Sequence, residues 1–263
     1  MEWISFLAAP FVMCLILVGI HCYLGLHVLR REVIFVDLSL AQVASLGSSV
    51  ALLFHFEHGS SESYFLSLAF TFLAAAYFAW AKKFEHIVSQ EVLIALVYAF
   101  ASSLVILVVS MLAHGAEHIK EILIGKILWV TWDDIFKTGA IYFVVALIHF
   151  FFRKQIFAAT NGESKGGLWD FLFYALFGVV ITSSVGIAGI LLVFSFLVVP
   201  ALLSMQVSKY IRSQLYTGWG IGSVLALIGM ITSYKLDMPA GAIIVVVFTM
   251  VPILLLPVLS FKK

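Results

Sequence analysis

The sequence predicts an all-α membrane protein, a polytopic bundle of about nine transmembrane helices, and three observations support this fold class. Of its 263 residues, 63% are hydrophobic and only 11% are charged, whereas a soluble domain is about 45–50% apolar and about 25% charged. The apolar residues gather in long runs that short polar segments separate. Most runs have the ~17–25 residues that a membrane-spanning helix needs. The lipid bilayer is therefore the expected surroundings of the chain.

Nine apolar runs are expected to form the spanning helices of a single transmembrane domain, residues 1–263. The runs are residues 4–27, 33–56, 64–80, 92–112, 135–152, 168–185, 188–205, 216–232 and 242–259. Eight helices are the alternative, because the sixth and seventh runs almost touch near Gly186. Gly186 and Gly189 allow a tight turn at this point, but they are equally compatible with one bent helix or a re-entrant pair.

The basic residues predict how the chain is oriented in the membrane. An outside N-terminus and a cytoplasmic C-terminus place most of the 15 Lys and Arg residues in cytoplasmic segments, as the positive-inside rule requires. These residues are Arg30, Arg31, Lys82, Lys83, Arg153, Lys154, Lys165, Lys209, Arg212, Lys262 and Lys263. The net charge is only +1, and nucleic acid binding needs a basic patch, so no nucleic-acid partner is expected.

Polar side chains inside or at the ends of the runs are candidate ligands on an ion path. Asp37 lies in the second run, and a carboxylate at the centre of a spanning helix costs about 2.5–3.5 kcal/mol. Gln42 follows about 140° around the same helix, so the two side chains could flank a wide cavity. His21, His27 and His149 offer imidazole, the commonest metal ligand. Alternatively, Asp37 pairs with a nearby Arg or caps a helix start, and the other side chains only hydrogen-bond between helices.

The outer connection, residues 113–134, contains the sequence HGAEH and then an amphipathic stretch, which predicts a short helix at the membrane interface. On a helix, His114 and His118 share a face with Glu117 beside them, a spacing that suits zinc. These three residues allow a metal-capture site, a zinc peptidase of the inverted H-x-x-E-H type, or simply solvated loop side chains.

The inner connection, residues 153–167, starts with a helix-compatible sequence that Asn161-Gly162 interrupts. The chain contains no Walker A sequence, G-x-x-x-x-G-K-[ST], so it does not bind ATP by that device. If the chain takes part in ATP-driven transport, another chain must hydrolyse the ATP, and this chain is not itself an enzyme.

Three parts of the sequence resemble the permeases of the zinc, manganese and iron uptake branch of the ABC transporters. GLHVLRREVIF (25–35) followed by DLSLAQVASLG (37–47) resembles that family's arginine turn and second helix. ILIGKILWVTWDD (122–134) is similar to its outer-loop signature. GILLV (189–193) through VVPA (198–201), and then DMPAG (237–241), resemble its late Pro-Ala helix and Asp-x-Pro-x-Gly turn.

The resemblance implies a homodimeric permease in the bacterial inner membrane that imports a divalent metal ion by alternating access along the dimer interface. It implies two cytoplasmic ATPase subunits that bind ATP, and an extracytoplasmic metal-binding protein that delivers the ion. The expected ATPase docking segment is residues 153–167, with a smaller contribution from residues 82–90. The residues expected to make this contact are Arg153, Lys154, Gln155, Asn161 and Gly162.

The second run departs from the family pattern at the expected metal site. The family's second helix carries an Asp and, one turn later, a His before a glycine. Counting back from Gly47, Gln42 takes the His position and Leu38 takes the Asp position, with Asp37 displaced by one residue. The resemblance therefore implies a rebuilt path site in which Asp37 and Gln42, with His21 or His27, hold the transported ion. A secondary ion transporter is the alternative function.

Overall fold

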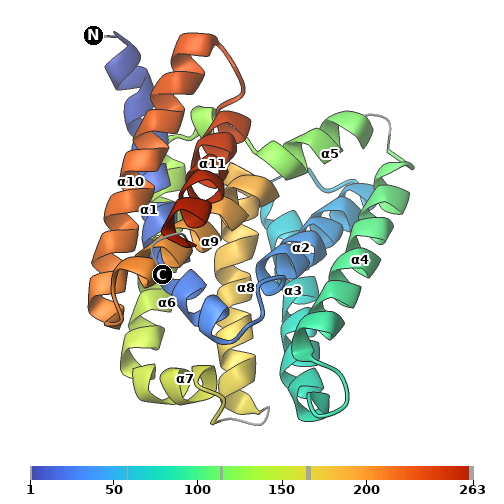
Figure 1. The fold of residues 1–263 in the computed structure, drawn as a ribbon. Coiled ribbons are helices and arrows are strands. Elements are labelled where there is room, and N and C mark those ends of the chain that lie inside the picture. Colours follow the sequence, from blue (N-terminus) through green and yellow to red (C-terminus); the bar gives the residue numbers. More distant parts are fainter. Residues whose placement is uncertain (1, 58, 113–114, 164–166, 261–263) are drawn as a thin grey trace. The chain divides into compact units, whose positions relative to one another are not determined.

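A computed structural model describes residues 2–57, 59–112, 115–163 and 167–260. The described residues form eleven α-helices and two 3-10 turns, η1 (Lys82–Phe84) and η2 (Ile127–Trp129), with no strand among them. The α-helices are α1 (Glu2–Arg30), α2 (Val36–Leu53), α3 (Ser61–Ala81), α4 (Gln90–Val109), α5 (Gly115–Ile124), α6 (Trp132–Phe151), α7 (Arg153–Thr160), α8 (Leu168–Ala188), α9 (Ile190–Val207), α10 (Ile211–Leu236) and α11 (Ala240–Ser260) (Figure 1).

All nine predicted runs are helical, which confirms the all-α polytopic bundle. Within the described residues, eight helices are long and apolar enough to cross a membrane, namely α1, α2, α3, α4, α6, α8, α9 and α10. The last helix, α11, contributes a shorter apolar stretch, Ala240–Leu255.

The break between the sixth and seventh runs lies at Gly189 and not at Gly186. Gly189 has φ 76° and ψ 161° and separates the end of α8 from the start of α9. A positive φ is accessible to glycine without steric cost, since glycine has no Cβ atom. Gly186 lies inside α8. From the sequence, Gly186 and Gly189 were equally possible turn positions. The positive φ of Gly189 identifies it as the break.

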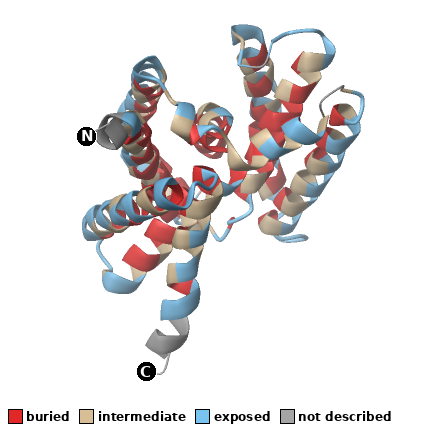
Figure 2. Cartoon of the chain, turned by 90° about the horizontal axis from the view of Figure 1, so that it is seen from above, coloured by how far each residue is buried: buried red, intermediate tan, exposed pale blue. Residues whose placement is uncertain are grey.

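The chain divides into two compact units. The terminal unit comprises Met1–Leu26, Ile124–Gly139 and Ile187–Lys263, and the central unit comprises His27–Leu123 and Ala140–Gly186. Both units contain buried residues (Figure 2). Because α1, α6 and α8 each continue from one unit into the other, we propose that the units belong to the single domain expected from the sequence.

In the terminal unit, small residues allow close contact between helices. Gly218 and Gly222, a G-x-x-x-G pair in α10, are both buried. A Cβ atom on Gly222 would lie 2.5 Å from the Val18 Cγ1 atom of α1, and one on Gly218 would overlap the Cys22 thiol. The pair therefore serves helix packing, as small-residue stripes do in membranes.

In the central unit, α2 packs against α3 and α4. A Cβ atom on Gly47 of α2 would lie only 2.6 Å from the Ser67 Cα atom of α3. As a result, 72% of the α2 span is buried, compared with 22% of the α4 span. The short helices α5 and α7 lie at opposite ends of this unit (Figure 1). Their presence confirms the short helix predicted in the outer connection and the helical start predicted for the inner one.

Candidate functional site

Asp37 lies in the first turn of α2 and is fully buried, with 0% of its surface exposed. Neither carboxylate oxygen has a hydrogen-bond partner among the residues that the structure describes. The expected alternative, a pair between Asp37 and a nearby Arg, is not present there, since the Arg31 guanidinium binds Asp170. A buried carboxylate without a partner is costly, so Asp37 is a candidate ligand for a cation.

The start of α2, and with it Asp37, is held by a short turn after α1. The Val36 amide donates to the Val33 carbonyl (3.1 Å), and the Val33 amide donates to the Val28 carbonyl of α1 (3.3 Å). The Glu91 carboxylate, from the first turn of α4, accepts a hydrogen bond from the Phe35 amide (3.1 Å). A carboxylate at a helix N-terminus satisfies amides that the helix itself leaves unpaired. The position of Asp37 is therefore fixed by α1 and α4 together.

The other predicted path residues belong to both units. Gln42 is on α2 and 8% exposed. In the central unit, the His27 Nδ1 atom lies 2.8 Å from the Thr160 hydroxyl oxygen, and the His27 and His149 ring centroids are 6.3 Å apart. His21 belongs to the terminal unit, with Nδ1 2.8 Å from the Leu17 carbonyl oxygen of its own helix.

No three His, Cys, Asp or Glu side chains in the described part of the chain come close enough together to hold a metal ion. Tetrahedral metal sites use four ligands. Asp37 and Gln42 alone therefore do not make a complete coordination shell among the described residues.

In the outer H-x-x-E-H segment, His114 lies outside the described residues, whereas Glu117 and His118 are described. Glu117 is exposed, whereas His118 is only 9% exposed and its Nε2 atom lies 3.3 Å from the Ser49 hydroxyl oxygen of α2. The two side chains thus have different surroundings, and the His118 ring contributes to holding α5 against α2.

The predicted docking residues all lie on the exposed side of the segment that contains α7. The exposed residues are Arg153, Lys154, Gln155, Asn161 and Gly162. Ile156, Ala159 and Thr160 are buried. The helix therefore packs on the central unit through one face and leaves these polar residues exposed.

A buried ion cluster, which the sequence interpretation missed, lies next to α7. Asp170, in the first turn of α8, binds the Arg31 guanidinium (3.0 Å) and the Lys82 ammonium group (2.9 Å). Asp170 and its cations are far apart in the sequence, so no local pattern indicated the pairing. The only signal was an acidic residue at the start of a predicted span, where charges are rare.

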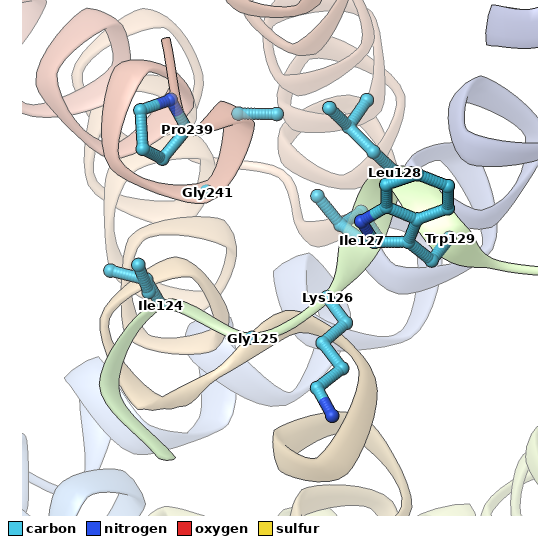
Figure 3. A pocket seen from close by; sticks show the side chains of 9 residues that line it. Ile124, Gly125, Lys126, Ile127, Leu128, Trp129, Pro239 and Gly241 are labelled. Atoms are coloured by element: carbon cyan, nitrogen blue, oxygen red, sulfur yellow. The ribbon is translucent and has the colours of Figure 1, made fainter. Parts of the chain in front are cut away.

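Two of the resembling stretches meet in the terminal unit around a cavity of about 130 Å³. Residues 124–129 and 239–241 line the cavity (Figure 3). The Lys126 amide donates to the Ile187 carbonyl (2.8 Å), which joins the outer-loop segment to the end of α8. No lining residue carries a carboxylate or an imidazole. The cavity lining therefore lacks the side chains that most often bind transition metals.

Comparison with known proteins identifies the family. A "Probable metal transport system membrane protein" of Chlamydia muridarum is 23% identical over 164 residues, which cover 60% of this chain and 56% of that protein. The "Manganese transport system membrane protein MntC" of Listeria monocytogenes is 26% identical over 171 residues, covering 62% and 61%. The chain thus spans less than two thirds of the length of either relative.

A solved structure shares the fold. The structure titled "PsaBC from Streptococcus pneumoniae in complex with Fab" matches with a TM-score of 0.74 and 18% identity, covering 93% of this chain and 88% of that chain. The sequence profile of the ABC 3 transport family matches residues 4–259. Because this match covers nearly all of the sequence, the chain belongs to the ABC 3 transport family.

Proposed function

We propose that this chain is the transmembrane permease subunit of an ATP-driven importer for a divalent transition metal ion, zinc, manganese or iron. The observation that carries the proposal is the enclosed Asp37 carboxylate, without a described partner, in the helix that resembles the metal-binding helix of such permeases. The names of the relatives, metal and manganese transport proteins, point to the same substrate class.

The proposed mechanism is alternating access in a homodimer. Two copies would supply two Asp37 carboxylates and two Gln42 amides, enough oxygen ligands for a weak, transient site. A path site should bind its ion weakly, because a deep energy minimum would trap it. Asp37 is enclosed in this conformation, so α2 must move relative to its neighbours before an ion reaches the carboxylate.

We propose that separate ATPase subunits drive this movement from the cytoplasm and that an extracytoplasmic metal-binding protein delivers the ion. An outer capture site would depend on His114 and the exposed Glu117, since His118 already contacts Ser49. The Lys82 ammonium group lies 3.4 Å from the Ala159 carbonyl oxygen of α7, so two basic segments share one end of the central unit. The positive-inside rule supports a cytoplasmic position for this end, and the proposed location is the inner membrane of a bacterium.

Reconstitution tests the function directly. Proteoliposomes that contain this chain with its ATPase and binding protein should accumulate Zn²⁺, Mn²⁺ or Fe²⁺ only when ATP is supplied on the ATPase side. Omission of either partner should stop accumulation. Concentrative uptake by the chain alone, driven by a proton gradient, would instead identify a secondary transporter.

Charge reversal on α7 should weaken ATPase binding. The double variant Arg153→Glu/Lys154→Glu replaces two exposed cations, which should reduce the ATPase that co-purifies with the chain by about tenfold, because unlike charges across an interface become like charges. Lys209→Glu/Arg212→Glu is the matched control, since it reverses two exposed cations in another predicted cytoplasmic segment. Equal losses in both variants would argue against α7 as the docking helix.

A further inference from the structure

The buried cluster at the end of the central unit connects α7 to the turn before α2. Arg31, between α1 and α2, has a side chain that is only 4% exposed, and that of Asp170 is 0% exposed. The Arg31 Nη1 atom donates to the Asp170 carboxylate (3.0 Å), and its Nε atom donates to the hydroxyl oxygen of Thr160, the last residue of α7 (3.3 Å). One guanidinium therefore binds α7 and α8 at once, as the forked geometry of Arg allows.

The Thr160 hydroxyl group accepts a second hydrogen bond from α1. Its single hydrogen is donated to the Ile156 carbonyl oxygen (2.8 Å), so its oxygen acts as the acceptor for both neighbours. His27 Nδ1, 2.8 Å away, must then carry the proton of that bond. His27, in the last turn of α1, and Arg31, just after α1, thus both bind the end of α7.

Arg31 is also held in place by an aromatic ring. Its Cζ atom lies 3.9 Å from the centroid of the Phe173 ring, within the range of a cation–π contact. Asp170 is paired with Lys82 as well, so the carboxylate does not depend on Arg31 for a cation. Arg31 is therefore not needed to neutralise Asp170. Its burial is instead explained by its bonds, which connect α7 to the turn between α1 and α2.

We propose that Arg31 is a positioning residue that transmits movement of α7 to α2, and hence to Asp37. The inference rests on the proposed function, in which α7 binds the ATPase and Asp37 contacts the ion. The turn between Arg31 and Asp37 is short and hydrogen-bonded at Val33, Phe35 and Val36. A displacement of Arg31 should therefore also displace the start of α2.

The test uses a variant that removes Arg31 but leaves Asp170 with its other described cation. Arg31→Gln keeps the pair between Lys82 and Asp170. Proteoliposomes with the ATPase that co-purifies with the chain and the binding protein are used to measure Mn²⁺ or Zn²⁺ uptake and ATP hydrolysis in parallel. Arg31→Gln should retain ATPase binding and hydrolysis but lower the ions imported per ATP by about tenfold.

Thr160→Val tests the same connection without changing any charge. It removes the oxygen that binds Arg31 and His27 and should also lower the ions imported per ATP. Thr71→Val, a buried site bonded to Ser67 and Thr182 in the same unit, is the control that should leave the ratio unchanged. These variants keep the test valid if Arg31→Gln fails to fold.

An unchanged ratio in Arg31→Gln or Thr160→Val, or an equal loss in Thr71→Val, would overturn the coupling role of Arg31. These outcomes differ from failure of the proposed function itself. In that case the wild-type complex would show no ATP-dependent metal uptake.

Discussion

Replacing Asp37 with leucine should abolish metal transport and, at the same time, make the folded chain more stable. Loss of a path ligand should lower uptake by about 100-fold or more, since even groups that only support a metal ligand contribute about 10–100-fold. Leucine has a similar shape and removes a buried carboxylate that has no described partner. Removing such an unsatisfied group should stabilise the fold by about 1–3 kcal/mol, less the smaller favourable interaction of a carboxylate with a helix N-terminus.

The measurement pairs ATP-driven uptake in proteoliposomes with the thermal unfolding midpoint in detergent. Ser39→Ala is the matched control, because Ser39 is also fully buried on α2 and its hydroxyl has no partner among the described residues. That variant should gain stability without losing uptake. Wild-type uptake in Asp37→Leu would remove Asp37 from the path, and a large fall in its unfolding midpoint would give the carboxylate a structural role.

The substitution Gly125→Ala should prevent stable folding. Gly125 has φ 65°, and an added Cβ atom would overlap the backbone of Ala188 and Gly189, at the junction of α8 and α9. The left-handed conformation alone costs a residue other than glycine about 1–2 kcal/mol. Since the neighbouring atoms are backbone and cannot rotate away, the total loss should reach about 4–5 kcal/mol, the range of the most disruptive single changes.

Gly59→Ala separates the cost of the left-handed backbone from the cost of the steric overlap. Gly59 also has a positive φ, 79°, but a Cβ atom there would meet nothing within 4 Å. Its unfolding midpoint should fall only slightly, whereas Gly125→Ala should give little folded protein after purification in detergent. Similar behaviour of the two variants would show that the loop around Gly125 moves aside, and that its contact with the α8–α9 junction matters little for folding.

The fold was largely predictable from the sequence because lipid selects long apolar helices, and composition alone identifies them. The helix that contains Asp37 and Gln42 lies where the second run predicted it. The exact break between α8 and α9 was not predictable, because Gly186 and Gly189 have the same local chemistry. Only the backbone angles of Gly189 show which of them ends a helix.

The candidate site was less predictable, since its contacts join residues that are far apart in the sequence. Spacing placed His118 on the same helical face as His114, but it could not reveal that Ser49, 69 residues away, faces the His118 ring. The Arg31–Asp170 pair spans 139 residues and follows no motif. In contrast, the exposure of Arg153, Lys154 and Gln155 followed from local sequence, because polar residues in a short amphipathic helix face away from the apolar core.

The deep burial of α2 also bears on how the protein is assembled in the membrane. This helix contains Asp37, Gln42 and four serines, so the translocon would release it into lipid less readily than the far more apolar α4. The helices α3 and α4 cover α2, and both are synthesised after it. We therefore expect α2 to leave the translocon together with later helices, which makes biogenesis of the central unit a cooperative event.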